Sequence, residues 1–141
     1  MLSTLSAGLF AGAATYINLV EHPARMQCGT ELAVKEFAPS YRRATVMQAP
    51  LAAVGFLSAT GAWLMGAALW WLLGGIVLVA VIPFTLIVIL PTNKKLLNIS
   101  PDTSTELASR LLKRWGRLHA LRSVLSLTSF IIFIVLLVRN L

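Results

Sequence analysis

Three long stretches of this chain carry no charged side chain, and they constrain its fold more than any other feature. Residues 1–20, 46–90 and 123–138 contain no Asp, Glu, Lys or Arg. The hydrocarbon core of a bilayer is about 30 Å thick, and a helix needs roughly 20 apolar residues to cross it. The middle stretch is long enough for two helices, with a turn near residues 61–68. The pattern therefore predicts four transmembrane helices, near residues 2–22, 46–66, 69–91 and 118–139.

The composition indicates a membrane protein rather than a soluble domain. Of the 141 residues, 57% are hydrophobic and only 12% are charged, about half the charged share of a soluble domain. A chain of this length forms one domain. We therefore expect a single all-α membrane domain over residues 1–141, a four-helix bundle whose cytoplasmic connections cover about residues 23–45 and 92–117.

The segment before the fourth span is expected to be an amphipathic helix on the membrane surface. Its apolar and basic residues recur at helical spacing, so they fall on two different faces. Such a helix lies in the interface plane, and the fourth span would begin where it turns into the bilayer. The apolar stripe consists of Leu107, Leu111, Leu112, Trp115 and Leu118, and the basic stripe of Arg110, Lys113, Arg114 and Arg117.

The basic residues are distributed unevenly over the two expected faces. Eleven of the 12 Lys and Arg residues fall on the side of the two connections, and only Arg139 falls beside the termini. The positive-inside rule then places both connections in the cytoplasm and both termini outside. The expected partner of these cations is a bilayer with anionic headgroups. Nucleic acid is not expected, because the interleaved aromatic residues of single-strand-binding surfaces are missing.

Small residues recur at helical spacing in the first two spans and allow helix backbones to approach closely. We expect them to form the interior of one bundle, with a homo-oligomer as the alternative use. The single cysteine, Cys28, excludes a disulfide within the chain. The small residues are Gly8 and Gly12 in the first span and Ala52, Gly55, Ala59 and Ala62 in the second.

A group of polar residues falls where the four helices are expected to meet the cytoplasmic face. Both histidines are there, His22 after the first span and His119 at the start of the fourth. Trp115 and Arg122 stand four residues before and three after His119, so the three share a helical face that should point into the bundle. His22 and His119 are the candidate catalytic residues. The candidate substrate-binding residues are Arg25, Tyr41, Gln48, Asn93, Trp115 and Arg122.

Three kinds of function fit this group. Histidine can abstract a proton from an acidic carbon or a phenol near neutral pH, and arginine can hold the resulting anion. Alternatively, His22 and His119 could be ligands of a haem or a metal ion, although two histidines without cysteine make a weak nonhaem signature. The third class is a non-enzymatic carrier or assembly partner with an anion-binding vestibule. No cofactor is favoured among these.

Four segments carry a recognisable pattern. They are the glycine-rich first span running into Tyr16 and EHPAR, FAPSYRRATVMQAPLA, IPFTLIVILPTNKKL, and ELASRLLKRWGRLHALRSVL. Together they resemble the anthrone-oxygenase-like family of small four-helix membrane proteins, long catalogued as a domain of unknown function. The resemblance covers about residues 5–138. Its motifs are His-Pro after the first span, Pro-x-Asn after the third, and Trp followed four residues later by His. Their positions here are His22, Pro23, Asn93, Trp115 and His119.

The resemblance implies a reaction. Fungal members of the family oxidise anthrones, which are tricyclic phenolic ketones, to anthraquinones with dioxygen. It therefore implies a membrane-embedded monooxygenase, cofactor-independent or metal-dependent, acting on a hydrophobic phenolic or anthrone-type compound that enters from the bilayer. In this hypothesis His22 or His119 is the base, and Arg25, Arg122 and Asn93 stabilise the oxyanion.

Overall fold

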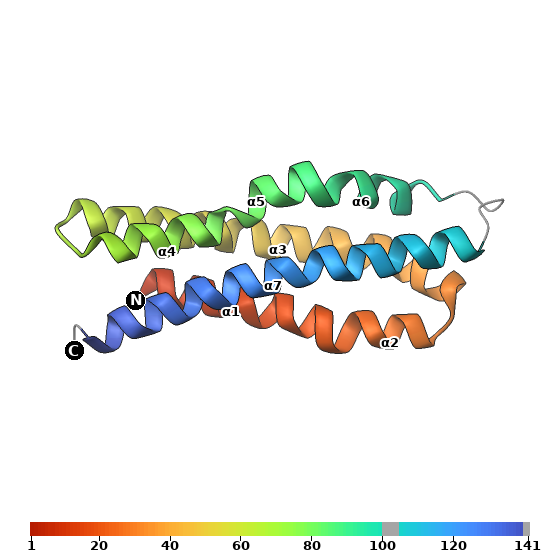
Figure 1. Ribbon diagram of the computed structural model, residues 1–141, viewed down its shortest axis with the longest axis horizontal. Coiled ribbons are helices and arrows are strands. Elements are labelled where there is room, and N and C mark those ends of the chain that lie inside the picture. Colours follow the sequence, from red (N-terminus) through yellow and green to blue (C-terminus); the bar gives the residue numbers. More distant parts are fainter. Residues whose placement is uncertain (100–104, 140–141) are drawn as a thin grey trace.

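The computed structural model describes residues 1–99 and 105–139, and within these ranges it contains only helices and turns. Four long helical segments lie side by side in one elongated bundle (Figure 1). The first consists of α1 (Leu2–Tyr16), the π-helix η1 (Ile17–Glu21) and α2 (His22–Gln27), and the second is α3 (Thr30–Leu64). The third consists of α4 (Leu69–Val79), α5 (Val81–Phe84), the π-helix η2 (Thr85–Ile89) and α6 (Leu90–Leu97), and the fourth is α7 (Thr105–Arg139).

The two ends of the chain lie at the same end of the bundle, next to the turn between α3 and α4 (Figure 1). The turn between α2 and α3 lies at the opposite end. Each of these turns contains a glycine with positive φ, Gly29 at 91° and Gly66 at 96°. Glycine adopts this backbone conformation without the steric cost that a Cβ atom adds, so it suits the points where the chain reverses.

The predicted four-helix membrane bundle is confirmed, and its helices are longer than the predicted spans. Three of the segments, Thr30–Leu64, Leu69–Leu97 and Thr105–Arg139, are long and apolar enough to cross a membrane. At 1.5 Å per residue, α3 and α7 are each roughly 52 Å long, whereas the hydrocarbon core is about 30 Å thick. The expected connections are therefore largely helical extensions of the bundle. A membrane-spanning position of the first segment stays a prediction.

The amphipathic pattern before the fourth span is confirmed, but the expected change of direction after it is wrong. Helix α7 is continuous from Thr105 to Arg139. Most of the apolar stripe packs against the other helices instead of lying on the membrane, while Leu107 and the basic stripe are exposed. Because buried residues recur every three or four positions, one face of α7 stays inside the bundle along its whole length. They are Ala108, Leu112, Trp115, His119, Ser123, Ser126, Ser129, Phe133 and Leu136.

The interior divides into two apolar clusters with a polar layer between them. One cluster, near the termini, includes Phe10, Leu78 and Phe133, and the other, toward the opposite end, includes Phe37 and Trp115. Between the clusters, α3 contributes buried Gln48 and α7 contributes the segment from His119 to Ser123. The bundle therefore buries a polar layer partway along its length.

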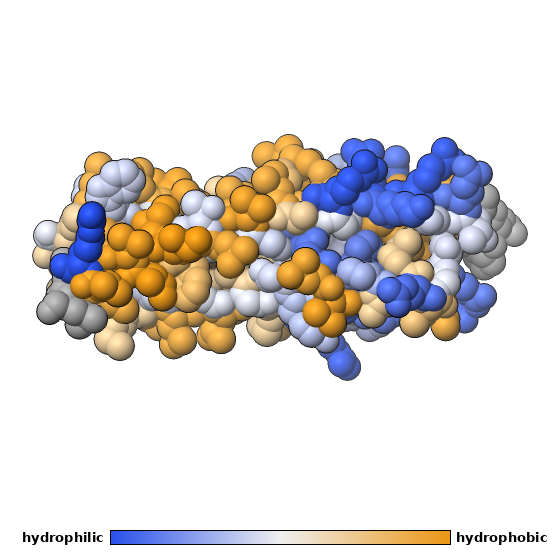
Figure 2. All heavy atoms as spheres, turned by 60° about the horizontal axis from the view of Figure 1, so that its bottom comes forward, coloured by the Kyte–Doolittle hydropathy of each residue, from blue (hydrophilic) through white to orange (hydrophobic). Residues whose placement is uncertain are grey.

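The polar layer lies at the depth where the bilayer hydrocarbon is expected to end. His119 is 20 residues from the end of α7 at Arg139, which corresponds to about 30 Å of helix. Figure 2 shows hydrophobic side chains over the half of the bundle that carries the termini, and hydrophilic side chains gathered toward the other end. A 30 Å slab that begins at the termini therefore ends near His119.

Most of the small residues pack inside the bundle, as expected. Ala52 and Ala59 are fully buried. A Cβ atom on Gly8 would lie 2.8 Å from the Phe130 ring. Gly12 differs from these residues, because no atom lies within 4 Å of the position that its Cβ would take.

Close packing of α3 on α4 at Gly75 is testable by adding one methyl group. A Cβ on Gly75 would lie 2.9 Å from the Ala59 Cβ and 3.5 Å from the Phe56 Cα. Because neither atom belongs to the flexible end of a side chain, Gly75→Ala should lower stability by about 1–3 kcal/mol. Thermal unfolding in detergent measures this. Gly61, which faces open space on α3, provides the control Gly61→Ala, and equal stabilities of the two variants would contradict the packing.

Candidate functional site

His119 lies inside the polar layer, where its surroundings determine which ring nitrogen carries hydrogen. The side chain is 2% exposed, and its Nδ1 lies 2.6 Å from the Asn18 Oδ1. The Asn18 amide nitrogen donates to the Gly116 backbone carbonyl at 3.1 Å, so Oδ1 is the acceptor of that amide. Oδ1 also accepts from the Ser123 hydroxyl at 2.7 Å. Nδ1 of His119 is therefore protonated, and Nε2 carries the free lone pair.

The residue that orients His119 lies on a π-helical turn. Asn18 belongs to η1, whose Ile17–Glu21 span interrupts the first helix. Single π-helical turns of this kind occur frequently at functional sites. The π-helical turn ends just before Pro23, which stands at the start of α2, and the chain continues there as a helix. Asn18 and His22 both contact α7.

Trp115 is in contact with both histidines. Its ring centroid lies 4.8 Å from that of His119 in a stacked arrangement and 5.2 Å from that of His22 in a tilted one. Phe37 of α3 packs edge-on at 5.3 Å, and the Arg25 guanidinium lies 5.6 Å from the indole centroid. The indole therefore holds side chains from three helical segments in fixed positions around His119.

Arg25 is buried and is paired with two carboxylates. Its Nη2 pairs with Glu21 and donates to the Ser40 hydroxyl at 3.0 Å, and its Nε lies 2.6 Å from the Glu36 Oε2. The Ser40 hydroxyl in turn donates to Glu21. The positive charge of Arg25 is therefore balanced inside the protein, and the network ties the first helical segment to α3.

Arg122 differs from Arg25, because no carboxylate among the described residues balances its positive charge. Its Nη2 donates to the neutral Gln48 Oε1 at 2.7 Å, and its guanidinium lies 5.5 Å from the centre of the Phe10 ring. Its Nε is buried and has no hydrogen-bond partner in the part of the chain that the structure describes. Over residues 1–99 and 105–139, no carboxylate forms an ion pair with Arg122. Its charge therefore remains available to an anion in the polar layer.

A small cavity between η1, α3 and α7 brings five of the eight candidate residues together. Its volume is about 10 Å³, which corresponds to roughly one water molecule. Gln48 is linked to this cavity through its hydrogen bond to Arg122. The five candidates that line it are Arg25, Tyr41, Trp115, His119 and Arg122, and the other lining residues are Ile17, Phe37, Ser40, Ala44 and Thr45.

His22 and Asn93 stand apart from the cavity lining. A Cβ on Gly116 would lie 2.5 Å from the His22 Nε2, so this nitrogen faces the backbone of α7. Asn93 is fully buried in α6, and neither atom of its amide has a hydrogen-bond partner among the described residues. The cavity is thus lined by three of the four segments, with no contribution from α6.

The described residues do not form a multidentate metal site. Within residues 1–99 and 105–139, no three or more His, Cys, Asp or Glu side chains are grouped so that they could hold a metal ion. Nδ1 of His119 is occupied by Asn18, and Nε2 of His22 faces Gly116. A haem held by both histidines would therefore require His22 to leave its packed position.

The sequence-based candidates omitted several residues of the site. Asn18 and Ser123 stand four residues from His22 and from His119, so helical spacing could have identified both. Glu36 and Ser40 fall in a region expected to be a connection. Because that region is helical in the structure, they also lie four residues apart on one face of α3 and meet Arg25 there.

The pairing of Arg25 is testable through stability. Arg25→Gln would leave Glu21 and Glu36 close together without a cation, so unfolding in detergent should become easier by about 2–3 kcal/mol. This is less than the 3–5 kcal/mol typical of a fully buried pair, because the Glu36 side chain is 44% exposed.

The exposed pair of Lys35 and Glu31 has the same spacing of four residues and supplies a control. Lys35→Gln should have little effect. The double variant Arg25→Gln/Glu36→Gln should recover part of the loss. If Arg25→Gln and Lys35→Gln were equally stable, Arg25 would not be the link between the first segment and α3.

Comparison with known proteins agrees with the resemblance noted in the sequence. Residues 37–132 match the sequence profile of a family described as anthrone oxygenase. No curated protein and no solved structure matches the chain. The matched segment includes α3 from Phe37 onward and α7 as far as Ile132, and thus both helices that carry most of the cavity lining. Because it covers more than half of the chain, this protein belongs to the anthrone oxygenase family.

Proposed function

We propose that this protein is a membrane-embedded monooxygenase that oxidises a hydrophobic phenolic compound of the anthrone type with dioxygen and needs no cofactor. The observation that supports the proposal is the arrangement of His119, which keeps a free lone pair on Nε2 and lines the same small cavity as Arg122, a cation without an ion pair among the described residues. Membership of the anthrone oxygenase family supports the class of reaction. The substrate and the residue roles are our inference.

His119 is the base in this proposal. A general base needs an accessible lone pair close to the proton that it removes. The Asn18 hydrogen bond leaves that lone pair on Nε2 of His119, and His119 lines the cavity. His22 is the weaker candidate because its Nε2 packs against Gly116. Its role is to support Trp115, against which His119 stacks.

The reaction balances without an external reductant. His119 removes a proton from the CH₂ group of the anthrone and leaves an electron-rich phenolate-type anion. The anion gives one electron to dioxygen, and the resulting radical pair combines to form a C–O bond. The protonated His119 returns its proton to the peroxide. Loss of water then breaks the O–O bond and forms the new carbonyl, so one oxygen atom of dioxygen enters the quinone and the other leaves as water.

Arg122 stabilises the anion in this proposal. A preorganised cation in a site shielded from water acts strongly on charge that develops during the reaction. Gln48 holds the guanidinium through one nitrogen, and the buried Nε has no hydrogen-bond partner within residues 1–99 and 105–139. Arg25 is assigned a structural role because two carboxylates already balance it. Asn93 is assigned no contact with substrate, since it does not line the cavity.

Oxygen uptake with a defined anthrone tests these roles. Protein in lipid nanodiscs receives 1,8-dihydroxyanthrone, and uptake is corrected for spontaneous oxidation in empty nanodiscs. His119→Gln should slow the reaction by about 10²–10⁴-fold, the usual contribution of a general base. Arg122→Met should slow it by about 10²–10³-fold, as expected for loss of one oxyanion-stabilising group.

Matched variants show whether the losses are specific. Arg114→Met changes an exposed arginine on the same helix and should react at the parent rate, and His22→Gln should keep most of the activity. A folded His119→Gln protein that consumes oxygen as fast as the parent would refute His119 as the base. Binding of the anthrone by the parent without oxygen consumption would favour the carrier class instead.

We also propose that both termini lie outside the cell and that the end of the bundle with the α2–α3 turn faces the cytoplasm, where its basic residues meet anionic headgroups. Cys28 is exposed at this turn.

A membrane-impermeant maleimide should label Cys28 in inside-out vesicles and leave it unlabelled in intact cells. In a Cys28→Ser background, Met65→Cys in the α3–α4 turn, where Met65 is 90% exposed, should give the reverse pattern. The opposite pair of results would invert the orientation.

A further inference from the structure

The cavity beside His119 is too small to enclose a tricyclic substrate. It has a volume of about 10 Å³, whereas sites for small organic molecules usually measure about 300–1,000 Å³. The body of a substrate that reacts at His119 must therefore lie in a larger space that adjoins this cavity. The described residues contain such a space between the first segment and α3.

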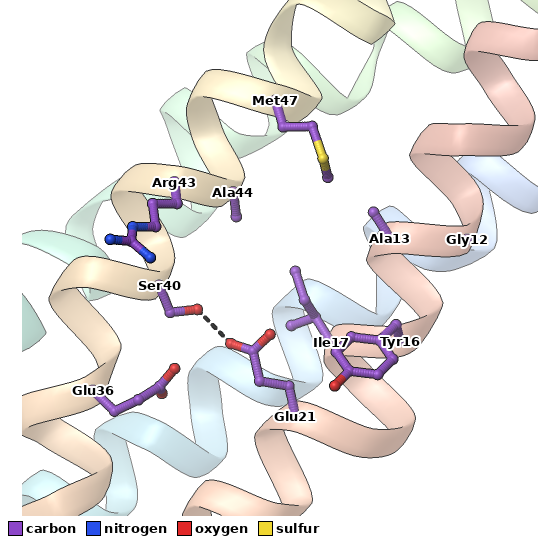
Figure 3. A pocket seen from close by; sticks show the side chains of 10 residues that line it. All are labelled: Gly12, Ala13, Tyr16, Ile17, Glu21, Glu36, Ser40, Arg43, Ala44 and Met47. Carbon is purple, nitrogen blue, oxygen red and sulfur yellow. Dashed lines mark hydrogen bonds between the residues drawn. The ribbon is translucent and has the colours of Figure 1, made fainter.

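Two hollows follow each other between α1 and α3. The first has a volume of about 590 Å³, and Figure 3 shows Tyr16, Ile17 and Glu21 on one side of it and Ser40, Ala44 and Met47 on the other. The second, of about 530 Å³, lies closer to the termini. Together they are called the α1–α3 groove below.

The groove adjoins the cavity. Ala13 and Met47 line both hollows of the groove. Ile17, Ser40 and Ala44 line both the first hollow and the cavity of His119. A space of ligand size therefore lies next to the cavity of the proposed base, with these three side chains in the wall between them.

We infer that the α1–α3 groove is the lateral entrance for substrate and that it holds the aromatic rings while the reactive carbon reaches His119 past Ile17. This inference rests on the proposed oxygenase function. Entry from the side suits a compound that dissolves in the bilayer, because such a compound reaches the groove without crossing water.

The lining of the groove matches an amphiphilic aromatic compound. The hollow nearer the termini is lined by apolar residues such as Leu5, Leu9 and Val54. The hollow nearer His119 adds the polar side chains of Glu21 and Ser40, which hydrogen-bond to each other. A flat molecule with apolar rings and a phenolic edge meets a suitable surface at both ends, whereas a lipid acyl chain matches only the apolar part.

Ile17 and Gly12 are the residues that control this route. Ile17 is 6% exposed and stands on the π-helical turn that also carries Asn18, so it separates the groove from the cavity. Gly12 leaves the groove wide, because nothing lies within 4 Å of its Cβ position. A leucine at position 12 would fill part of the groove without a clash inside the protein.

Photolabelling tests occupancy of the groove independently of catalysis. Protein in nanodiscs is irradiated with an azidoanthraquinone, and the labelled peptides are mapped by mass spectrometry. Labels should fall on residues 12–21 and 36–47, and an excess of 1,8-dihydroxyanthraquinone should remove them. Gly12→Leu should abolish this labelling. Gly61→Leu, which also places leucine in open space on a helix but outside the groove, should not.

The catalytic variants separate the two proposals. His119→Gln should still be labelled in the groove, so an active His119→Gln protein would refute the mechanism and leave the groove inference standing. Gly12→Leu should also lower kcat/KM for the anthrone about tenfold or more, as expected when a binding pocket is obstructed, with Gly61→Leu unchanged. Two results would overturn the inference, because each would mean that the groove holds lipid alone. One is labelling only on the outer faces of α4 and α7. The other is labelling at residues 12–21 that the quinone does not displace.

Discussion

The hydrogen bond between Asn18 and His119 joins the first helical segment to the last, and the polar layer is arranged around it. In the interior of a membrane bundle, water is not available to satisfy a polar group, so an unpaired amide or imidazole is costly. Asn18 meets this constraint with three hydrogen bonds: its side-chain oxygen accepts from His119 and Ser123, and its amide nitrogen donates to the Gly116 carbonyl. The same contacts that stabilise the helix packing therefore determine the tautomer of the proposed base.

The two arginines that line the cavity differ in pairing, and the roles proposed for them follow from that difference. Arg25 meets two carboxylates from neighbouring segments and acts as a link between helices. Arg122 meets a neutral amide and a phenylalanine ring and keeps an unsatisfied nitrogen. The sequence does not distinguish them, since both are arginines and both stand three residues after a histidine. Only the unpaired arginine lowers the energy of an anion without first losing another partner.

The site could be predicted only in part from the sequence. Helical spacing correctly placed His119, Trp115 and Arg122 on the inner face of one helix, because spacing is a property of local geometry. It did not separate His22 from His119, and it included Asn93, which lies away from the cavity. Those differences depend on the rotation of each helix about its axis, which packing against neighbouring helices decides. The continuous course of α7 has the same origin, since most of its apolar stripe packs against other helices of the bundle rather than lying on a membrane.

By itself, the sequence determined that this protein is an all-helical membrane bundle, because charge-free stretches of that length have few other stable arrangements. It also determined the family and the helix faces that carry the histidines. The tertiary structure decided which histidine lines the cavity, which arginine has no carboxylate partner among the described residues, and where a groove of substrate size adjoins them. These properties arise from contacts between residues about 100 positions apart, such as Asn18 and His119. Local spacing along the sequence does not predict such contacts.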